Sequence, residues 1–527
     1  MMKQKNTHTP SEKLLILCAV CLAALVMPLS FTGPAVALSA IGRELGGSTI
    51  QLSWVTNAFM LSFGSSLMAA GTLADTYGRK RLFLIGVALF AIASFALALA
   101  PNIVCFDILR AVQGIAAAAA FSGGVAALAQ EFDGHSGARA FSMLGTTFGL
   151  GLAFGPLWSG LLIEAMGWRA IFLSTAAVGI VALIFGARCM RESREPNSAG
   201  LDWPGGASFT AALTVFTYAV LRAPESGWAS PSVIVLLLAA AVLLAAFVMI
   251  ENRVRKPMLD LSLFRYPRFV GVQFLAAAPA YAYVVLLVQL PIRLVGIEGH
   301  SEIDAGRIMI ALSAPMLVVP FIAAMLTRWI SAGLISGTGL LISAGGLFWL
   351  AQFPSVTPVM ATVWPMLTIG FGISLPWGLM DALAVSVVPR ERAGMAAGIF
   401  STTRVAGEGI ALAIVGAALA ALVQSNLAKA IAVAIPSAMQ PAQLATAAGR
   451  VAMGDLRQAM DILPAVSHAS LVQAYSGGFQ TLLCFLAAAT VLSAMIVFSF
   501  LRQPRGEARA GEMRGDGMGK PRPGASV

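Results

Sequence analysis

The chain has 527 residues, 58% of them hydrophobic and only 11% charged, and it carries a formal net charge of +10. About a quarter of the residues in an ordinary soluble domain are charged, so this composition excludes a water-soluble globular protein. The apolar residues form repeated blocks long enough to cross a bilayer, which takes about 20 residues per helix. We therefore predict an all-α polytopic membrane protein.

Fourteen apolar blocks are candidate transmembrane helices, and the block at 205–223 is the weakest because Gly, Ser and Thr lower its hydropathy. If residue 1 lies in the cytoplasm, 24 of the 34 Lys and Arg residues fall on the cytoplasmic side, 8 outside and 2 within spans. The positive-inside rule then places both termini in the cytoplasm. The charge thus indicates topology and contact with lipid headgroups, and it predicts no nucleic-acid partner. The predicted spans are 14–38, 51–72, 82–100, 103–128, 140–163, 168–188, 205–223, 231–250, 269–292, 305–326, 330–351, 357–388, 396–423 and 478–501.

The stretch GTLADTYGRKRL at 71–82 ends the second predicted span with a short basic turn. Its glycines allow tight helix approach and a sharp turn, and its Asp lies four residues before an Arg. The stretch resembles the signature between helices two and three of the major facilitator superfamily. The resemblance implies a charge network that latches the cytoplasmic face in one state, with Glu131 and Asp133 as expected partners. The predicted latch comprises Gly71, Asp75, Gly78, Arg79 and Lys80.

Arg110 lies well inside the fourth predicted span, in LRAVQGIAAAAA at 109–120. A charged side chain there costs about 2.5 to 3.5 kcal/mol on insertion scales and should face a polar interior. The stretch resembles the family's fourth-helix motif, carried here by Arg110, Gln113 and Gly114, and the resemblance implies an arginine that senses a neighbouring protonation. Asp107, three residues earlier on the same helix face, offers the alternative of a static ion pair with Arg110.

The stretch GTTFGLGLAFGPLWSGLL at 145–162 has glycines at spacing four, which let another helix approach closely, and a proline that bends the helix. It resembles the fifth-helix antiporter motif of the family's exporters, although Ser159 stands where a glycine is usual. The motif residues are Gly145, Gly149, Gly151, Gly155, Pro156 and Gly160.

Three further stretches resemble the fourteen-helix drug:H⁺ antiporter-2 subgroup of multidrug exporters: GWRAIFL at 167–173, ENRVRKPMLDLSLFRYPRF at 251–269 and RERAGMAAGIFSTTRVAGEGIALAI at 390–414. The resemblance implies a major facilitator fold with two six-helix bundles plus two extra central helices. It divides the chain into a cytoplasmic N-terminus (1–13), an N-terminal bundle (14–190), a linker with two extra transmembrane helices (191–265), a C-terminal bundle (266–501) with a large external loop (424–477), and a disordered basic cytoplasmic tail (502–527).

The first predicted helix departs from this subgroup, whose members carry an Asp shortly before a Thr-Ile-Val-Asn-Val-Ala-Leu-Pro run. Here MPLSFTGPAVALSAI places Ser30 at the position of that acid. A gradient-driven exporter needs a buried group whose protonation changes during the cycle, and a carboxylate suits this role because desolvation disfavours its charged form. We predict that Glu408 and Asp381 replace the missing acid.

The cations near these acids leave alternatives open. Glu408 has Arg404 one helical turn before it, so the two are open to permanent pairing, as are Asp107 and Arg110. Asp381 has no cation within one turn, which leaves it either nearer protonation at neutral pH or paired across helices. The proton-coupling candidates are Asp107, Arg110, Asp381, Arg404 and Glu408.

Aromatic and polar side chains near the middle of spans are candidates for a substrate cavity, because drug-accepting pockets combine aromatic faces with a few polar groups. A position facing lipid or the membrane interface is the alternative for each aromatic. The candidates are Trp54, Asn57, Phe59, Gln113, Tyr281, Tyr283, Gln289, Trp364 and Trp377.

The sequence lacks the His-Glu-x-x-His, Gly-x-Ser-x-Gly and Gly-x-x-x-x-Gly-Lys motifs, so we predict neither an enzyme nor a cofactor nor direct use of ATP. Four scattered histidines and five cysteines in or at the ends of spans predict no metal site. The resemblance implies export of drugs or other small amphipathic compounds in exchange for protons, by alternating access. Export of one endogenous metabolite, siderophore or antibiotic is an alternative, and a membrane sensor or scaffold without transport is another.

The predicted location is the cell membrane of a bacterium, with a small-molecule substrate, protons and the lipid bilayer as partners. A periplasmic adaptor is a further expected partner if the bacterium has two membranes.

Overall fold

The computed structural model describes residues 10–132, 134–194, 202–254, 259, 261–354, 359–388, 393–434 and 441–501. Every regular element in these ranges is a helix, which confirms the predicted fold class. The α-helices are α1 (Pro10–Leu45), α2 (Thr49–Tyr77), α3 (Arg79–Ala98), α4 (Ile103–Glu131), α5 (Gly134–Met166), α6 (Arg169–Cys189), α7 (Trp203–Ser226), α8 (Pro231–Arg253), α9 (Pro267–Pro279), α10 (Val285–Pro291), α11 (Glu302–Ser313), α12 (Val319–Leu326), α13 (Ala332–Leu350), α14 (Val359–Trp377), α15 (Met380–Ser386), α16 (Ala393–Ala434), α17 (Pro441–Ala452), α18 (Leu456–Ile462) and α19 (His468–Leu501). Shorter elements are the 3₁₀ turns η1 (Leu261–Arg265) and η4 (Ala314–Leu317) and the π-helical turns η2 (Ala280–Val284) and η3 (Ile292–Ile297).

Thirteen helical segments of the described chain are long and apolar enough to cross a membrane. The helix α2 is not among them, although its 29 residues match its neighbours in length, because Gln51, Asn57 and Asp75 together with several Ser and Thr residues lower its hydropathy. The block at 205–223 forms α7, which does qualify. The weakest span by hydropathy is therefore α2, and the expectation that it would be 205–223 was wrong.

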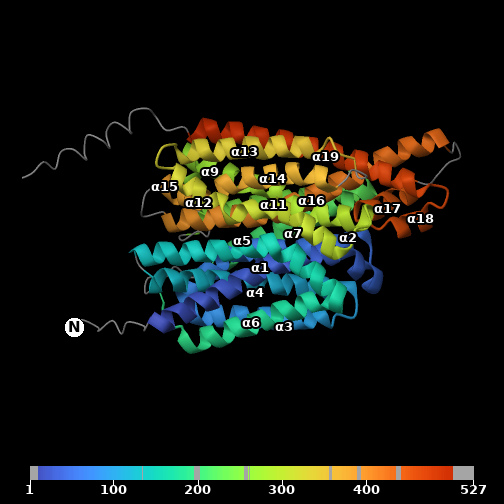
Figure 1. Cartoon of the computed structure of the whole chain (residues 1–527). Coiled ribbons are helices and arrows are strands. Elements are labelled where there is room, and N and C mark those ends of the chain that lie inside the picture. Colours follow the sequence, from blue (N-terminus) through green and yellow to red (C-terminus); the bar gives the residue numbers. More distant parts are fainter. Residues whose placement is uncertain are drawn as a thin grey trace, which may run out of the picture.

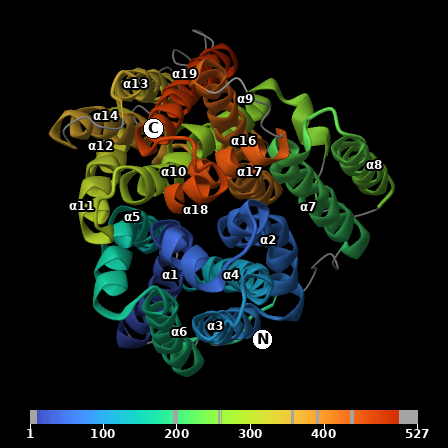
Figure 2. The ribbon, with the colours of Figure 1, turned by 90° about the vertical axis from the view of Figure 1, so that its right-hand side faces the viewer.

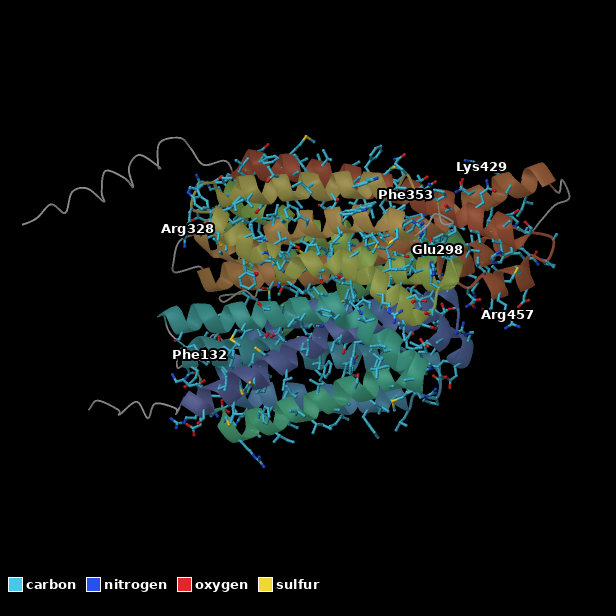
Figure 3. All side chains as sticks on the ribbon, in the orientation of Figure 1. Phe132, Glu298, Arg328, Phe353, Lys429 and Arg457 are labelled. Carbon is cyan, nitrogen blue, oxygen red and sulfur yellow. The ribbon has the colours of Figure 1, made fainter. Side chains whose placement is uncertain are left out.

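The two ends of the described chain lie on the same side of the helix bundle. The start of α1 and the end of α19 are at the same end of the molecule, as an even number of crossings requires (Figure 1). Phe132 and Arg328 lie toward this end, after α4 and α12, whereas Glu298 and Arg457 lie toward the other (Figure 3).

Polar residues begin many of the helices. Inside hydrocarbon a helix satisfies its own backbone groups, but its first N–H groups need another acceptor. Ser48 forms a capping box with Gln51 at the start of α2. Five other helices begin in the same way, each with a side-chain oxygen that accepts from a backbone N–H group of the first turn. These oxygens belong to Asn102, Asp202, Ser230, Ser301 and Ser331.

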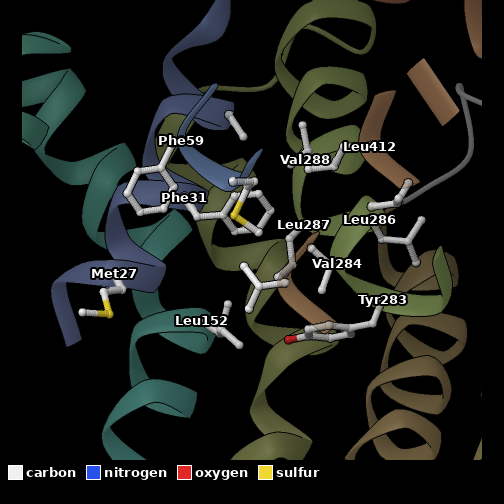
Figure 4. Packing of buried hydrophobic residues seen from close by; sticks show 14 of the residues in the cluster. Met27, Phe31, Phe59, Leu152, Tyr283, Val284, Leu286, Leu287, Val288 and Leu412 are labelled. Atoms are coloured by element: carbon white, nitrogen blue, oxygen red, sulfur yellow. The ribbon is translucent and has the colours of Figure 1, made fainter. Parts of the chain in front are cut away.

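The helices form two groups, α1–α6 and α9–α19, with α7 and α8 at the side (Figure 2). Across the boundary α2 packs against α16, α5 against α11, and α1 against α10 and η3. Apolar side chains fill this boundary, with Phe31 and Phe59 on one side and Val284 and Leu287 on the other (Figure 4). The helix α7 contacts both α2 and α16, and α8 packs on α7.

Several helices differ from the predicted spans. The span 357–388 breaks at Pro376 and Gly378 into α14 and α15. The span 269–292 contains the π-helical turn η2 and ends where the second one, η3, begins. The helix α16 runs eleven residues beyond the predicted end at 423, to Ala434. Two short helices, α17 and α18, lie within the stretch predicted as a loop, 424–477, and α19 begins at His468 rather than at 478.

A buried ion pair ties η3 to its surroundings. Arg293 Nε lies 2.7 Å from Glu298 Oε1, and the two side chains are 4% and 10% exposed. Arg293 also donates to the backbone oxygen of Pro354 at 3.2 Å, and its guanidinium lies over the Phe479 ring, 5.1 Å from the centroid. The pair thus joins η3 to the loop after α13 and to α19.

We predict that Glu298→Gln lowers the free energy of unfolding by about 3 to 5 kcal/mol, because it leaves the buried Arg293 guanidinium without its counter-charge. Asp304→Asn is the matched control, since it removes the partner of Arg307 in an ion pair whose side chains are 52% and 68% exposed. Such a surface pair contributes about 0 to 1 kcal/mol. Thermal unfolding of the purified chain in detergent measures both, and equal losses would contradict the prediction.

Candidate functional site

A cavity lies at the boundary between the two groups of helices. It encloses about 580 Å³ of space between atoms, including its mouth. The lining comes from α1, α2, α4 and α5 on one side and from η2, α14 and α16 on the other. The lining residues are Met27, Pro28, Phe31, Phe59, Met60, Phe63, Leu67, Phe121, Phe148, Leu152, Val284, Trp377, Arg404, Val405 and Glu408.

Two charged residues line this apolar cavity, Arg404 and Glu408, one turn apart on α16. Arg404 does not pair with Glu408. Its NH1 lies 3.5 Å from Asp381 Oδ1 on α15, and its guanidinium lies 5.9 Å from the Trp377 ring centroid and 5.6 Å from that of Phe400. The fixed intrahelical pair left open by the sequence is therefore not formed, and the pair across helices is.

Glu408 is buried, with 8% of its surface exposed. Within the described residues no cation lies within ion-pair distance of its carboxylate. A carboxylate in such surroundings loses hydration without gaining an ion-pair partner, which is costly for a charged group. Asp381 is 65% exposed, so its pair with Arg404 is partly hydrated and contributes about 0 to 1 kcal/mol. The two acids predicted to act together thus lie in different environments.

Two of the nine predicted cavity residues, Phe59 and Trp377, line this cavity. Trp364 is 63% exposed on the outside of α14, which agrees with the lipid-facing alternative. Trp54 packs between α7 and α16 instead.

The remaining predicted cavity residues are buried in the helix packing. The Tyr281 hydroxyl meets the Ser493 hydroxyl, and Tyr283 donates to Ser313 Oγ at 3.1 Å. Asn57 donates to the Ser53 backbone oxygen at 2.9 Å. Buried oxygens of Asn57 and Gln289 have no hydrogen-bond partner among the described residues.

Sequence reasoning missed most of the aromatic wall. Phe31, Phe63, Phe121 and Phe148 line the cavity, as does Met60. Phe59 and Phe63 lie one turn apart on α2 with ring centroids 5.9 Å apart, so the four-residue spacing from the predicted Phe59 could have found Phe63. The other aromatics come from separate helices, and no spacing along the chain relates them.

Arg110 lies in a separate buried network behind Phe59. Its Nε donates to the Val55 backbone oxygen at 2.8 Å, its NH1 to Gln113 Oε1 at 2.5 Å, and its guanidinium lies 4.6 Å from the Phe59 ring centroid. Gln113 in turn donates to Ser94 Oγ at 2.7 Å.

Asp107 makes no ion pair with Arg110. One of its oxygens is buried without a hydrogen-bond partner among the described residues, as is the NH2 group of Arg110. The static pair offered by the sequence is therefore absent from this state. The Arg110 network meets the cavity only through Phe59.

Ser30, which replaces the usual first-helix acid, lies buried in α1. Its hydroxyl is buried without a partner among the described residues. Neither Ser30 nor the Arg110 network supplies an acid to the cavity, so Glu408 is the acidic group that lines it.

The glycine motif of α5 lies against two other helices. A Cβ at Gly151 would meet Pro28 of α1, and one at Gly155 would meet Thr32 Oγ1 of the same helix. A Cβ at Gly160 would meet Glu302 at the start of α11. Gly145 has nothing within 4 Å, so the close approach predicted for it is absent.

The contacts of the remaining α5 motif residues are looser. A Cβ at Gly149 would lie 3.9 Å from the Met316 oxygen, an ordinary contact. Pro156 lies inside α5.

The predicted latch forms a turn between α2 and α3. Gly78 has a φ of 121°, which only glycine adopts readily. Arg79 NH2 lies 3.0 Å from Asp75 Oδ1, and Arg79 NH1 donates to Gln130 Oε1 at 3.3 Å. Gly71 has nothing within 4 Å, so the tight approach expected there is absent.

Of the two acids expected as partners of the latch, Glu131 lies 3.7 Å from Lys13, and Asp133 lies outside the described residues. Glu192, from the segment after α6, accepts from the backbone N–H groups of Lys80 and Arg81 at 3.2 Å each. This carboxylate caps the start of α3, where Gly78 has no side chain to do so.

A profile of the Major Facilitator Superfamily matches residues 20–412 of the chain, well over half of its length. The chain belongs to the major facilitator superfamily. The fold and the family together identify it as a transporter whose relatives confer multidrug and antibiotic resistance.

Three curated relatives illustrate this placement within the superfamily. The multidrug resistance protein Stp of Mycobacterium tuberculosis (strain CDC 1551) is 32% identical over 409 residues, covering 77% of this chain and 75% of the relative. The puromycin resistance protein pur8 of Streptomyces alboniger is 32% identical over 407 residues, covering 75% and 80%. The tetracenomycin C resistance and export protein of Streptomyces glaucescens is 27% identical over 424 residues, covering 79% and 78%.

Solved structures agree with the superfamily fold. A bacterial homologue of the human lysosomal transporter Spinster has a TM-score of 0.64 at 17% identity, with 94% of this chain and 99% of that chain covered. The D-xylose-proton symporter has a TM-score of 0.58 at 16% identity, with 93% and 97% covered. At these identities the likeness shows the fold alone.

The GWRAIFL stretch of this superfamily member forms a clamp between helices. Trp168 Nε1 donates to Glu44 Oε2 at 2.7 Å and Arg169 NH1 to Glu44 Oε1 at 2.5 Å. Arg169 Nε also donates to the Ala98 backbone oxygen at 3.0 Å. The ends of α1 and α3 are thereby joined to the start of α6.

We predict that Gly155→Ala lowers the unfolding temperature, because the added methyl group meets Thr32 and overpacking of this kind costs about 1 to 3 kcal/mol. Gly145→Ala, in the same helix, is the control and should be neutral or stabilising, since nothing surrounds it. Thr32→Ala should restore part of the loss. Thermal unfolding in detergent measures all three, and equal effects at positions 145 and 155 would refute the close approach.

Proposed function

We propose that the chain exports drugs or other small amphipathic compounds in exchange for protons, by alternating access. The observation that carries this proposal is Glu408, a buried carboxylate without an ion-pair partner among the described residues, on the wall of a central aromatic cavity. A group of this kind binds a proton or a substrate in the same place, which is what exchange requires. The resistance functions in the names of the relatives support drugs or antibiotics as substrates.

Arg404 supplies the coupling element in this proposal. When Glu408 is protonated, Arg404 keeps its pair with Asp381 and its stacking on Trp377. When Glu408 loses its proton, the guanidinium one turn away turns from the weak, partly exposed Asp381 pair toward the new buried charge. Proton release on one side of the membrane thereby changes a contact between α15 and α16, which favours one access state over the other.

The other motifs have supporting roles in the proposal. Asp75 and Arg79, with Gln130 and Glu192, hold the turn between α2 and α3 in one state. The glycines of α5 let it slide against α1 and α11, and Arg110 adjusts α4 to the charge state of Asp107.

The proposed setting is the cytoplasmic membrane of a bacterium, with both termini in the cytoplasm and α17 and α18 outside. The lysine and arginine bias supports this orientation. Two six-helix bundles with α7 and α8 as extra helices are the proposed units. In a double-membrane bacterium, a periplasmic adaptor would carry the substrate onward.

Export of a single compound is a second candidate. The Streptomyces glaucescens relative is named for resistance to and export of a single compound, tetracenomycin C. Six aromatic side chains and two methionines line the cavity. They favour a broad range of substrates instead, because such side chains adapt to ligands of different shapes.

We predict that expression in a pump-deficient host lowers both the accumulation of and the susceptibility to several structurally different drugs, because the cavity selects mainly for apolar and aromatic surface. A proton uncoupler should abolish the difference. Protection against one compound only would favour the second candidate, and normal expression without any change in accumulation would favour a sensor or scaffold.

We predict that Glu408→Gln abolishes substrate-driven proton movement in proteoliposomes, because the amide cannot exchange a proton, whereas Asp381→Asn weakens it by releasing Arg404. Glu164→Gln, an exposed position near the end of α5, is the control and should leave coupling unchanged. A fluorescent pH probe inside the vesicles measures the response. Undiminished coupling in both variants would refute the proton role of these acids.

A further inference from the structure

A second cavity opens on the side of the molecule, between the two extra helices and α16. It encloses about 750 Å³ of space between atoms and is bounded by apolar side chains throughout. Its walls come from α7, α8 and a single residue of α16. The lining residues are Ala212, Leu213, Phe216, Leu237, Ala240, Ala241, Leu244 and Ile410.

This side groove, formed by the eight residues just named, exists because α8 meets the rest of the chain mainly through α7. Only 17% of the apolar stretch of α8 is buried, less than in any of the other candidate spans of the described chain. In Figure 2, α8 is the outermost helix and α7 stands between it and the α2 and α16 pair. The groove is therefore the space left between α8 and α16, beside α7.

The groove is continuous with the surface that faces lipid. Val235, Leu238 and Val242 of α8 are 62%, 60% and 66% exposed, which is the composition of a surface in contact with hydrocarbon. The lining residues lie near the middle of both extra helices, at the depth of the acyl chains. Water has no polar partner here, and an empty space would forfeit the dispersion contacts of its walls.

We propose that an acyl chain of a membrane phospholipid occupies the side groove as an integral part of the structure. The chain fills the gap between α8 and Ile410 of α16, two helices that barely touch directly. Its methylene groups make the dispersion contacts with the groove walls that no side chain of the protein supplies.

This placement has a consequence for the helices that contact the groove. The helix α7 packs against α2 of one group and α16 of the other, so an acyl chain wedged behind it supports the contact between the groups. Ile410 lies two residues after Glu408, on nearly the opposite face of α16, so the groove and the central cavity share that helix as a wall.

The test is photolabelling of the full chain in nanodiscs that contain a phosphatidylcholine with a diazirine near the end of one acyl chain. Mass spectrometry then locates the labelled residues. We expect labels concentrated on Phe216, Leu237, Ala241 and Ile410. Ala241→Phe fills the groove and should reduce the labelling of Ile410 several-fold. Val242→Phe, a neighbouring position that faces outward, is the matched control and should leave it unchanged.

Three results would overturn the proposal. Labels spread evenly over the exposed face of α8, or equal labelling of Ile410 in both variants, would mean that the groove binds no acyl chain. If an added drug removes the labelling of Ile410 and added phospholipid does not, the groove binds substrate instead. The yield and unfolding temperature of both variants, measured beside the labelling, show that each is folded. The test does not depend on transport, so it stands apart from the proposed export function.

Discussion

An ionisable side chain inside hydrocarbon has to be paired, hydrogen-bonded or neutral, and this constraint accounts for the surroundings of three arginines described above. Arg293 is paired with Glu298 and held between an aromatic ring and a backbone oxygen. Arg110 satisfies its donors with a backbone oxygen and a glutamine. Arg404 reaches outward to Asp381. Glu408 and Asp107 remain without an ion-pair partner among the described residues, and of these two acids Glu408 lines the central cavity.

The contacts between helices are of two kinds: some are fixed by hydrogen bonds or ion pairs, and others are apolar and can shift. The Glu44 clamp and the Arg293 pair are held by several short hydrogen bonds each, and they rigidify the regions around the ends of α1 and around η3. The boundary between the groups is apolar around the cavity, apart from Arg404 and Glu408. Apolar surfaces can slide without breaking directional bonds, so movement between the groups costs less there than within them.

Much of the fold could be predicted because hydrophobic blocks and glycine turns are local features. The block lengths and the Gly78 turn lie in the sequence itself, and the structure has helices and a turn where they were expected. The rotation of each helix about its axis is set by its neighbours, and this is why Trp364 was taken for a cavity residue and Phe148 was not.

The ion-pair partner of Arg404 could not be predicted from the sequence, for the same reason as the cavity residues. Spacing along one helix offers Glu408 as a neighbour, whereas Asp381 approaches from a helix that begins only after the break at Gly378. The low hydropathy of α2 also has its cause in contacts that the sequence does not show. Much of its polar content, including Ser53 and Asn57, is buried against other helices and does not face lipid.

The length of α16 has a mechanical consequence. Its 42 residues make a rod on the order of 60 Å long at about 1.5 Å per residue, roughly twice the thickness of the hydrocarbon layer. The cavity residues Arg404 and Glu408 lie in its first half, and its far end packs against α17. A small tilt of α16 about the cavity would therefore move its far end, beside α17, by a larger distance than the residues at the cavity.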